Sequence, residues 1–197
     1  LCLVVPTVIS EVHGNPQIAK MGVIQPNGNM EGKEMRFSSY ATAFWSIATT
    51  VISTGSVNGM HDSFMPISGM NMLLGMMINS FYGGVGVGFL NFFVYLIIAV
   101  FIGGLMVGRT PEFLGKKVEA KEMKIASIVA LLHPFLILAF TALASYFTAH
   151  NTDMGWWFTD SAGKHNASGW LNNPSYHGFS EMLYQYSSSS GNNGSGF

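Results

Sequence analysis

The sequence predicts an all-α integral membrane protein made of repeated units, each with a membrane helix, a helix that enters the bilayer and turns back, a polar loop and another membrane helix. Only 10% of the 197 residues are charged and 49% are hydrophobic, whereas about 25% of residues in a typical soluble domain are charged. Two apolar segments, residues 85–108 and 125–148, are long enough to cross a bilayer. A short polar loop containing glycine and serine occurs twice, each time after an amphipathic segment.

The overall charge and the cysteine content narrow the function classes. The formal net charge is −1, and the sequence has neither the basic composition of a nucleic-acid-binding protein nor an acidic tail. A single cysteine, Cys2, excludes an internal disulfide framework. Residues 1–10 lack the charged start and the cleavage site of a signal peptide, so we expect them to complete a membrane helix. Because the chain has no initiator methionine and stops soon after Gly194, we expect a piece of a longer protein.

Residues 11–53 are expected to form an external loop and then a short helix. Residues 11–36 contain turn sequences with glycine, asparagine and proline, and their charged side chains are expected to lie in water. The charged residues close to the helix are Glu31, Lys33, Glu34 and Arg36. Residues 37–53 carry no charge and have hydrophobic side chains at spacings of three and four, which predicts a helix. Because a full span needs about 20 residues, we expect this helix to end inside the bilayer; a short buried helix is the alternative.

The two polar loops share an uncharged pattern of a polar residue, glycine and serine: Thr54, Gly55 and Ser56, then Asn193, Gly194 and Ser195. A dehydrated monovalent cation needs several neutral oxygens at a fixed distance. Backbone carbonyls supply these oxygens, and glycine permits the backbone conformations that align them. The C-terminal end of the preceding helix adds a partial negative charge. One such loop alone is typical of an ordinary turn, so the cation-site hypothesis depends on the duplication.

The residues that follow the first loop include candidates for attracting cations. Asn58 and Asp62 lie close to the loop in sequence, and a carboxylate at Asp62 would raise the local cation concentration. The alternative for Asp62 is a cap on the next helix. Residues 60–77 are rich in methionine, which we interpret as adaptable core packing and not as a copper site.

The first predicted span, residues 85–108, is preceded and ended by glycines. This glycine run does not follow a strand or match a dinucleotide-binding fingerprint. We expect the pairs Gly84 with Gly88 and Gly104 with Gly108 to let another helix approach closely.

The loop between the two spans predicts the orientation of the chain. Residues 109–124 hold five of the nine basic residues, so the positive-inside rule places this loop in the cytoplasm and both polar loops outside. We expect the second span, residues 125–148, to be interrupted at His133 and Pro134, with a neutral His133 ring bonded to carbonyls that Pro134 frees. Residues 149–176 are expected to form a second external loop.

The order of these elements occurs twice. Residues 1–108 form one repeat from the end of a membrane helix to the next span, and residues 109–124 are the cytoplasmic loop. Residues 125–197 form the first half of another repeat and end in its polar loop. We expect Phe179 to open the second short helix as Phe37 opens the first.

Several motifs resemble a single family. They are residues 29–34, 55–63, 83–86, 104–117, 177–181 and 192–195. In this order they resemble the potassium-binding subunit of the Kdp-type potassium-transporting ATPases, from about Gly28 to the end of the chain. The resemblance implies potassium-channel-like repeats of helix, re-entrant pore helix, filter loop and helix. Residues 1–108 would be the third of four repeats, with Gly55 as its filter glycine, and Gly194 would be the filter glycine of the fourth.

The resemblance also implies a function. The chain would belong to the potassium-binding and translocating subunit of an ATP-driven, high-affinity potassium uptake complex in the bacterial plasma (inner) membrane. Potassium would bind at the filter residues named above, and no organic cofactor or nucleic-acid partner is implied. The subunit would not hydrolyse ATP itself; a catalytic P-type ATPase subunit would do so, and small accessory subunits would complete the complex.

Two other functions are considered beside this one. A secondary transporter with broken helices would bind a small solute at the middle of the bilayer, and its uptake would follow an ion gradient instead of ATP. A membrane enzyme would use His61 and Asp62 as an acid/base pair. Adjacent residues on a helix point in different directions, and the sequence shows no accompanying nucleophile or metal-ligand set.

Overall fold

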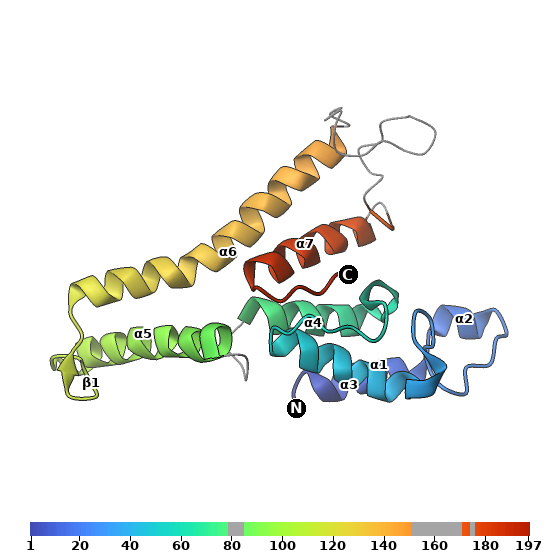
Figure 1. Ribbon diagram of the computed structural model, residues 1–197, viewed down its shortest axis with the longest axis horizontal. Helices are drawn as coiled ribbons and strands as arrows, with labels where there is room; N and C mark the ends of the chain where they lie inside the picture. Colours follow the sequence, from blue (N-terminus) through green and yellow to red (C-terminus); the bar gives the residue numbers. More distant parts are fainter. Residues whose placement is uncertain (79–84, 151–170, 174–175) are drawn as a thin grey trace.

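The computed structural model describes residues 1–78, 85–150, 171–173 and 176–197. Within these residues the chain is mostly helical (Figure 1). Helices α1, α3 and α4 pack together in one group, and α5 and α6 form a hairpin that extends away from it. Helix α7 contacts both α6 and α4, and so it joins the two groups.

The first group contains α1 (Val4–His13), α3 (Ser38–Val51) and α4 (Pro66–Ile78), and the short helix α2 (Pro16–Lys20) follows α1. The core of this group is a cluster of buried side chains from α3, α4, the segment before α4, and α7. The members are Ala43, Ile47, Phe64, Met72, Met76 and Tyr184. Two of the methionines of residues 60–77 are therefore core residues, as expected from the flexible shape of methionine.

A buried ionic cluster corrects the expectation that Lys33 lies in water. The side chains of Lys33 and Glu11 are fully buried, and Lys33 Nζ lies 2.8 Å from Glu11 Oε2. The other carboxylate oxygen, Oε1, accepts hydrogen bonds from Met65 N at 2.7 Å and Ser68 Oγ at 2.6 Å, at the start of α4. Asn29 Nδ2 donates to Oε2 at 2.9 Å. A buried charge pair is tolerated because these further bonds satisfy its remaining groups.

The second group contains two helices that are long and apolar enough to cross a membrane. A π-helical turn, η3 (Val85–Phe89), leads into α5 (Leu90–Val107), and α6 (Ala120–Ala149) follows. The expected interruption of the second span is wrong, because α6 continues through Pro134. Helix α6 also begins before residue 125, where Glu119 and Glu122 form a capping box.

The two glycines at the end of α5 meet no neighbouring helix among the described residues, so the expectation that they mark a helix contact stays a prediction. A Cβ atom at Gly104 would lie 2.7 Å from the Cβ of Pro111, in the following loop. Gly108 has a left-handed backbone and caps α5. Of the other glycine pair, Gly84 lies outside the described residues, as does most of the expected external loop 149–176.

The loop between α5 and α6 contains the two short β-strands found in the described residues. Strands β1 (Glu112–Phe113) and β2 (Lys116–Lys117) form an antiparallel hairpin. Leu114 and Gly115 both have positive φ, at 51° and 74°, as a two-residue hairpin turn requires. The prediction of an all-α chain is therefore wrong for this hairpin, although helices form the rest of the regular structure described.

Candidate functional site

The two polar loops lie against each other. Gly55 has φ +73° and Gly194 has φ +88°, which are left-handed values that favour glycine. A Cβ atom at Gly55 would lie only 2.9 Å from the carbonyl carbon of Gly194, so this position also needs glycine for space. Among the described residues, no atom lies within 4 Å of a Cβ at Gly194. The structure therefore brings together two glycines that are far apart in the sequence.

Both loops leave their helices with the same backbone geometry. Helix α3 ends at Val51 and α7 (Tyr176–Ser190) ends at Ser190. Ser53 and Asn192, two residues beyond these ends, have φ of 55° and 52°. The next amide in each loop donates back to the last turn: Thr54 N to Thr49 O at 3.1 Å, and Asn193 N to Ser188 O at 2.9 Å. These are the bonds of a Schellman motif, which turns the chain sharply after a helix.

The alignment of the two loops also corrects the expected start of the second helix. Counting back from the paired glycines, Tyr40 of α3 corresponds to Phe179 of α7. Helix α7 begins at Tyr176, so Phe179 lies inside its first turn and does not open it. The repeated unit is thus clearer in the backbone at the ends of the helices than in the residues at their starts.

An aromatic side chain from each helix binds the serine of its own loop. Trp45 Nε1 donates to Ser56 O at 2.9 Å, and the Tyr184 hydroxyl lies 2.9 Å from Ser195 Oγ. Trp45 and Tyr184 occupy equivalent positions on α3 and α7. Trp45 is 46% exposed, whereas Tyr184 is fully buried between the two repeats. Neither aromatic residue is among the site residues expected from the sequence. The sequence feature that could have identified them is an aromatic residue at the same number of positions before Gly55 and before Gly194.

Asn193 links the second loop to the first helix. Its Nδ2 donates to Thr49 O at 3.2 Å and to Thr50 O at 3.1 Å, two carbonyls in the last turn of α3. Carbonyls at a helix end lack partners within the helix. Asn193 Oδ1 accepts from Ser195 N at 3.1 Å and from Ser195 Oγ at 2.6 Å. Asn193 was expected to contribute its backbone carbonyl, and the structure shows that its side chain bridges the repeats.

The expected site residues differ in exposure. Thr54, Ser56 and Gly194 are exposed, Gly55 is partly buried, and Asn193 and Ser195 are buried. Asn58 is partly buried, and its Oδ1 has no hydrogen-bond partner among the described residues.

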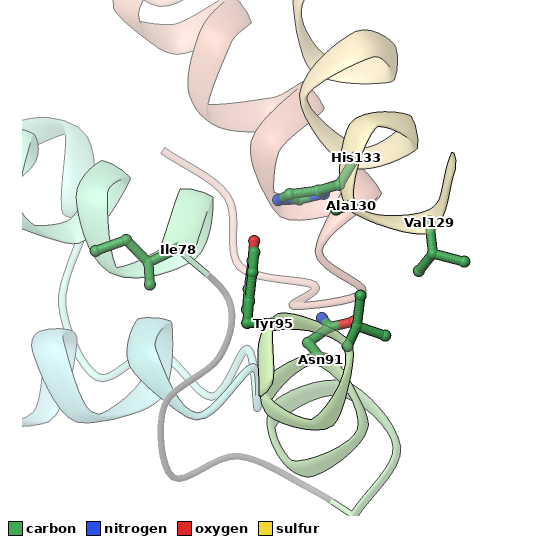
Figure 2. Close-up of a pocket in the computed structure, with 7 residues that line it drawn as sticks. Ile78, Asn91, Tyr95, Val129, Ala130 and His133 are labelled. Atoms are coloured by element: carbon green, nitrogen blue, oxygen red, sulfur yellow. The ribbon is translucent and has the colours of Figure 1, made fainter. Parts of the chain in front are cut away.

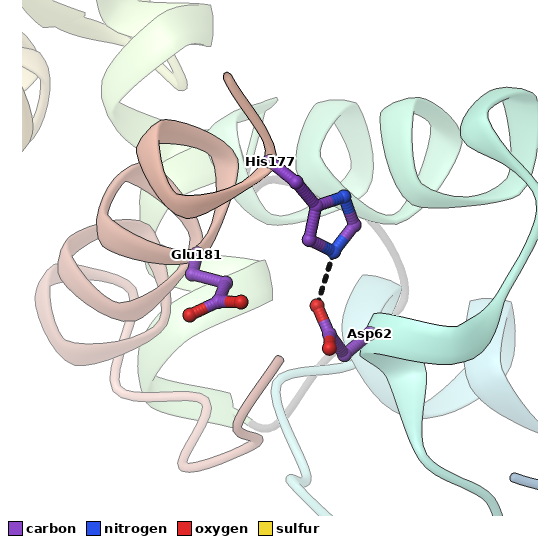
Figure 3. A group of neighbouring side chains, drawn as sticks. All are labelled: Asp62, His177 and Glu181. Atoms are coloured by element: carbon purple, nitrogen blue, oxygen red, sulfur yellow. Dashed lines mark hydrogen bonds and ion pairs between the residues drawn. The ribbon is translucent and has the colours of Figure 1, made fainter. Parts of the chain in front are cut away.

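Asp62 belongs to a second contact between the repeats (Figure 3). Its carboxylate pairs with His177 Nε2 and accepts from Asn173 Nδ2 at 2.7 Å. Glu181, one turn along α7, accepts from the backbone amides of Asn172 at 2.9 Å and Asn173 at 2.8 Å. Asp62, His177 and Glu181 lie close together, but the carboxylate oxygens of Asp62 and Glu181 already accept hydrogen bonds from these groups. The arrangement ties the segment before α4 to the start of α7.

His61 is buried beside this contact and has a different partner. Its Nδ1 lies 2.7 Å from the Tyr184 hydroxyl. Burial and, to a smaller extent, the positive charge of Lys33 together lower the pKa of His61 to about 4. His61 is therefore neutral at neutral pH. The structure pairs His61 with Tyr184 and Asp62 with His177, so it does not form the acid/base pair considered above.

A small pocket lies between α5 and α6, near the end of α4 (Figure 2). Its lining includes Asn91, Tyr95 and His133, which are polar side chains on membrane-capable helices. His133 Nδ1 lies 2.7 Å from Ser190 Oγ at the end of α7. The expectation that His133 binds carbonyls freed by Pro134 is therefore wrong. Because α7 packs against α6, a tertiary partner meets the ring instead.

Comparison with known proteins identifies relatives of the whole chain. Residues 1–197 match the model of the family described as Potassium-transporting ATPase A subunit. Proteins named potassium-transporting ATPase potassium-binding subunit from Flavobacterium johnsoniae and Flavobacterium psychrophilum are each 68% identical over all 197 residues, which cover 34% of each relative. The protein of the same name from Phocaeicola vulgatus is 65% identical over 190 residues, or 96% of this chain and 32% of the relative. The chain thus spans about one third of the length of these relatives.

The helical fold, the two membrane-capable helices and the paired polar loops define a helical membrane protein. The match of the family model extends from the first residue to the last. The chain belongs to the potassium-transporting ATPase A subunit family, as its motifs indicated.

Proposed function

We propose that the chain forms part of the potassium-binding and translocating subunit of an ATP-driven, high-affinity potassium uptake complex. The observation that carries this proposal is the close approach of Gly55 and Gly194, each in a left-handed turn at the C-terminal end of a helix. Carbonyls of Thr54, Gly55 and Ser56, and of the equivalent residues Asn193, Gly194 and Ser195, would replace the water around a potassium ion.

The C-terminal ends of α3 and α7 favour a cation at the paired polar loops. Helices α3 and α7 both end at the paired loops, so both place the negative end of a helix dipole there. No lysine or arginine lies within either loop. Neutral oxygens and two helix ends attract a monovalent ion without the strong fixed charge that would trap it.

The proposed topology follows from the charges. The hairpin loop with Lys116 and Lys117 lies in the cytoplasm, and the paired loops face the outside of a bacterial inner membrane. The chain is a non-catalytic part of the complex. A P-type ATPase subunit hydrolyses ATP, small accessory subunits complete the assembly, and potassium is the only ligand proposed.

Uptake by the full-length subunit in its complex tests this function. We expect Gly194→Ala to raise the KM for rubidium, used as a tracer at low external potassium, by about tenfold, because alanine in a left-handed turn costs about 1–2 kcal/mol. Gly55→Ala has the same strain and a steric clash, so we expect a larger effect. Gly115→Ala is the matched control, because φ at Gly115 is +74° and its Cβ would meet no atom of the described part of the chain within 4 Å.

The outcomes separate the proposed function from its alternatives. Unchanged KM and selectivity in both loop variants would remove the loops from the ion path. Uptake that continues without ATP and follows an imposed ion gradient would instead support the secondary transporter.

A further inference from the structure

We propose that His61 is a positioning residue for the second polar loop: acting through Tyr184 and Ser195, it holds Asn193 and Gly194 in the geometry that sets potassium affinity and selectivity. This inference rests on the proposed function. His61 lies in η2 (His61–Ser63), after the first loop, so it would connect the first repeat to the loop of the next.

A continuous path of hydrogen bonds carries this proposal. His61 Nδ1 lies 2.7 Å from the Tyr184 hydroxyl, which lies 2.9 Å from Ser195 Oγ. Ser195 Oγ lies 2.6 Å from Asn193 Oδ1, and Asn193 Nδ2 reaches Thr50 O of α3 at 3.1 Å. The path therefore begins in the first repeat, passes through the second loop and returns to the first repeat.

The direction of every bond in this path can be assigned. Asn193 Nδ2 must donate to the carbonyls of α3, so Oδ1 is the acceptor and Ser195 Oγ donates to it. Because the single hydroxyl proton of Ser195 is used, Tyr184 donates to Ser195. The Tyr184 oxygen then accepts from His61, which therefore carries its proton on Nδ1. His61 Nε2 is left as a bare lone pair, and it has no partner among the described residues.

The path is enclosed by side chains that restrict its motion. His61 is 1% exposed, Tyr184 0% and Ser195 2%. The Tyr184 ring stacks on Phe197 with 4.5 Å between ring centres, and the His61 ring meets Phe64 edge-on at 5.6 Å. Water therefore does not compete for these hydrogen bonds, and the loss of one member leaves its neighbour unsatisfied.

The first loop shows why the second needs His61. Trp45 donates a ring N–H, whose direction is fixed by the ring, to the backbone carbonyl of Ser56. Tyr184, at the equivalent position, donates a hydroxyl that rotates about its C–O bond, and it reaches a side chain instead of the backbone. By donating to Tyr184, His61 orients that hydroxyl toward Ser195.

Three variants of the full-length subunit, each assembled in its native complex, test the inference. Tyr184→Phe removes one oxygen and His61→Ala removes the donor, and we expect each to raise the KM for potassium about tenfold. We expect the preference for potassium over rubidium to fall in parallel, while the maximal rate stays within about twofold. His61→Asn places an amide donor near the position of Nδ1, so we expect it to restore most of the affinity.

A control variant and a double variant define the results that would overturn the positioning role of His61. Tyr186→Phe makes the same change on α7, but its ring stacks on Phe140 of α6, and we expect wild-type kinetics. Because His61 and Tyr184 act along one path, His61→Ala with Tyr184→Phe should have no larger effect than either change alone. Fully additive effects, or equal defects in His61→Asn and His61→Ala, would overturn the inference.

The same measurements separate failure of this inference from failure of the proposed function. If Gly194→Ala impairs affinity while His61→Ala and Tyr184→Phe both behave as wild type, the positioning role is wrong and the function stands. If Gly194→Ala is also normal, the proposed function fails. Should His61→Ala not assemble, Tyr184→Phe still decides the outcome, because it preserves most of the buried volume: an unchanged KM and selectivity in Tyr184→Phe would overturn the inference.

Discussion

At the scale of single residues, the environment of His61 combines burial with a nearby positive charge. The ring is 1% exposed, and Lys33 opposes its protonation. The pKa of His61 is lowered from 6.5 to about 4 in the folded chain. A protonated ring would need water or a carboxylate, and its nearest hydrogen-bond partner is the neutral hydroxyl of Tyr184.

This pKa predicts an acid-sensitive stability. The folded state binds fewer protons at His61 than the unfolded state, so the contribution is complete above pH 6.5 and is lost as the pH falls toward 4. We expect the Tm of the purified complex to fall between pH 7 and pH 4.5. The fall should be smaller in His61→Asn, whose side chain does not titrate. Equal pH dependence in the two proteins would show that His61 is not the group responsible.

At the scale of the elements, the Glu11 and Lys33 pair joins α1, the loop after α2 and the start of α4. Each charge is fully buried, and the carboxylate also binds the backbone amide of Met65, just before α4 begins. The loop is therefore part of the packed structure and not a solvated connection. The backbone of Lys33 also forms an isolated antiparallel β-bridge with Gly59. The segment after the first polar loop is therefore held against the loop that carries Lys33.

Removal of one member of this pair should destabilise the protein strongly. We expect Glu11→Gln to cost about 3–5 kcal/mol, because it leaves the Lys33 ammonium buried without its counter-charge. The double change Glu11→Gln with Lys33→Met should recover part of the loss. Thermal unfolding of the purified complex measures both. Glu34→Gln is the control, since its pair with Arg36 is exposed and we expect a change within about 0.5 kcal/mol. Similar losses for Glu11→Gln and Glu34→Gln would contradict a role for the buried pair.

At the scale of the whole molecule, the paired loops depend on contacts between two repeats. Helix α7 contacts α4 and α6, while Asp62 and His177 join the segment before α4 to the start of α7. Apart from the contact between α6 and α7, the apolar side chains of α5 and α6 are largely exposed, as suits helices surrounded by lipid or by other membrane helices.

The proposed topology predicts which positions react from each side of the membrane. In a cysteine-free background of the full-length subunit, with Cys2→Ser, Leu114→Cys in the hairpin turn should react with an impermeant thiol reagent only from the cytoplasmic side. Tyr176→Cys, at the start of α7, should react only from the outside. Both side chains are highly exposed, at 82% and 94%. Labelling of intact cells and inverted vesicles measures this, and reaction of both positions from one side would refute the topology.

The amino-acid sequence by itself determined the class of protein, its family, the two membrane-capable helices and the doubled loops around Gly55 and Gly194. These features depend on hydrophobic length, helical spacing and the backbone freedom of glycine, all of which are local properties. Only the tertiary structure decided which polar groups meet. Lys33, His61 and His133 have their partners on distant segments, and Asn193 reaches the end of α3, because packing of one repeat against another selects these contacts. Spacing along the chain carries no information on that choice.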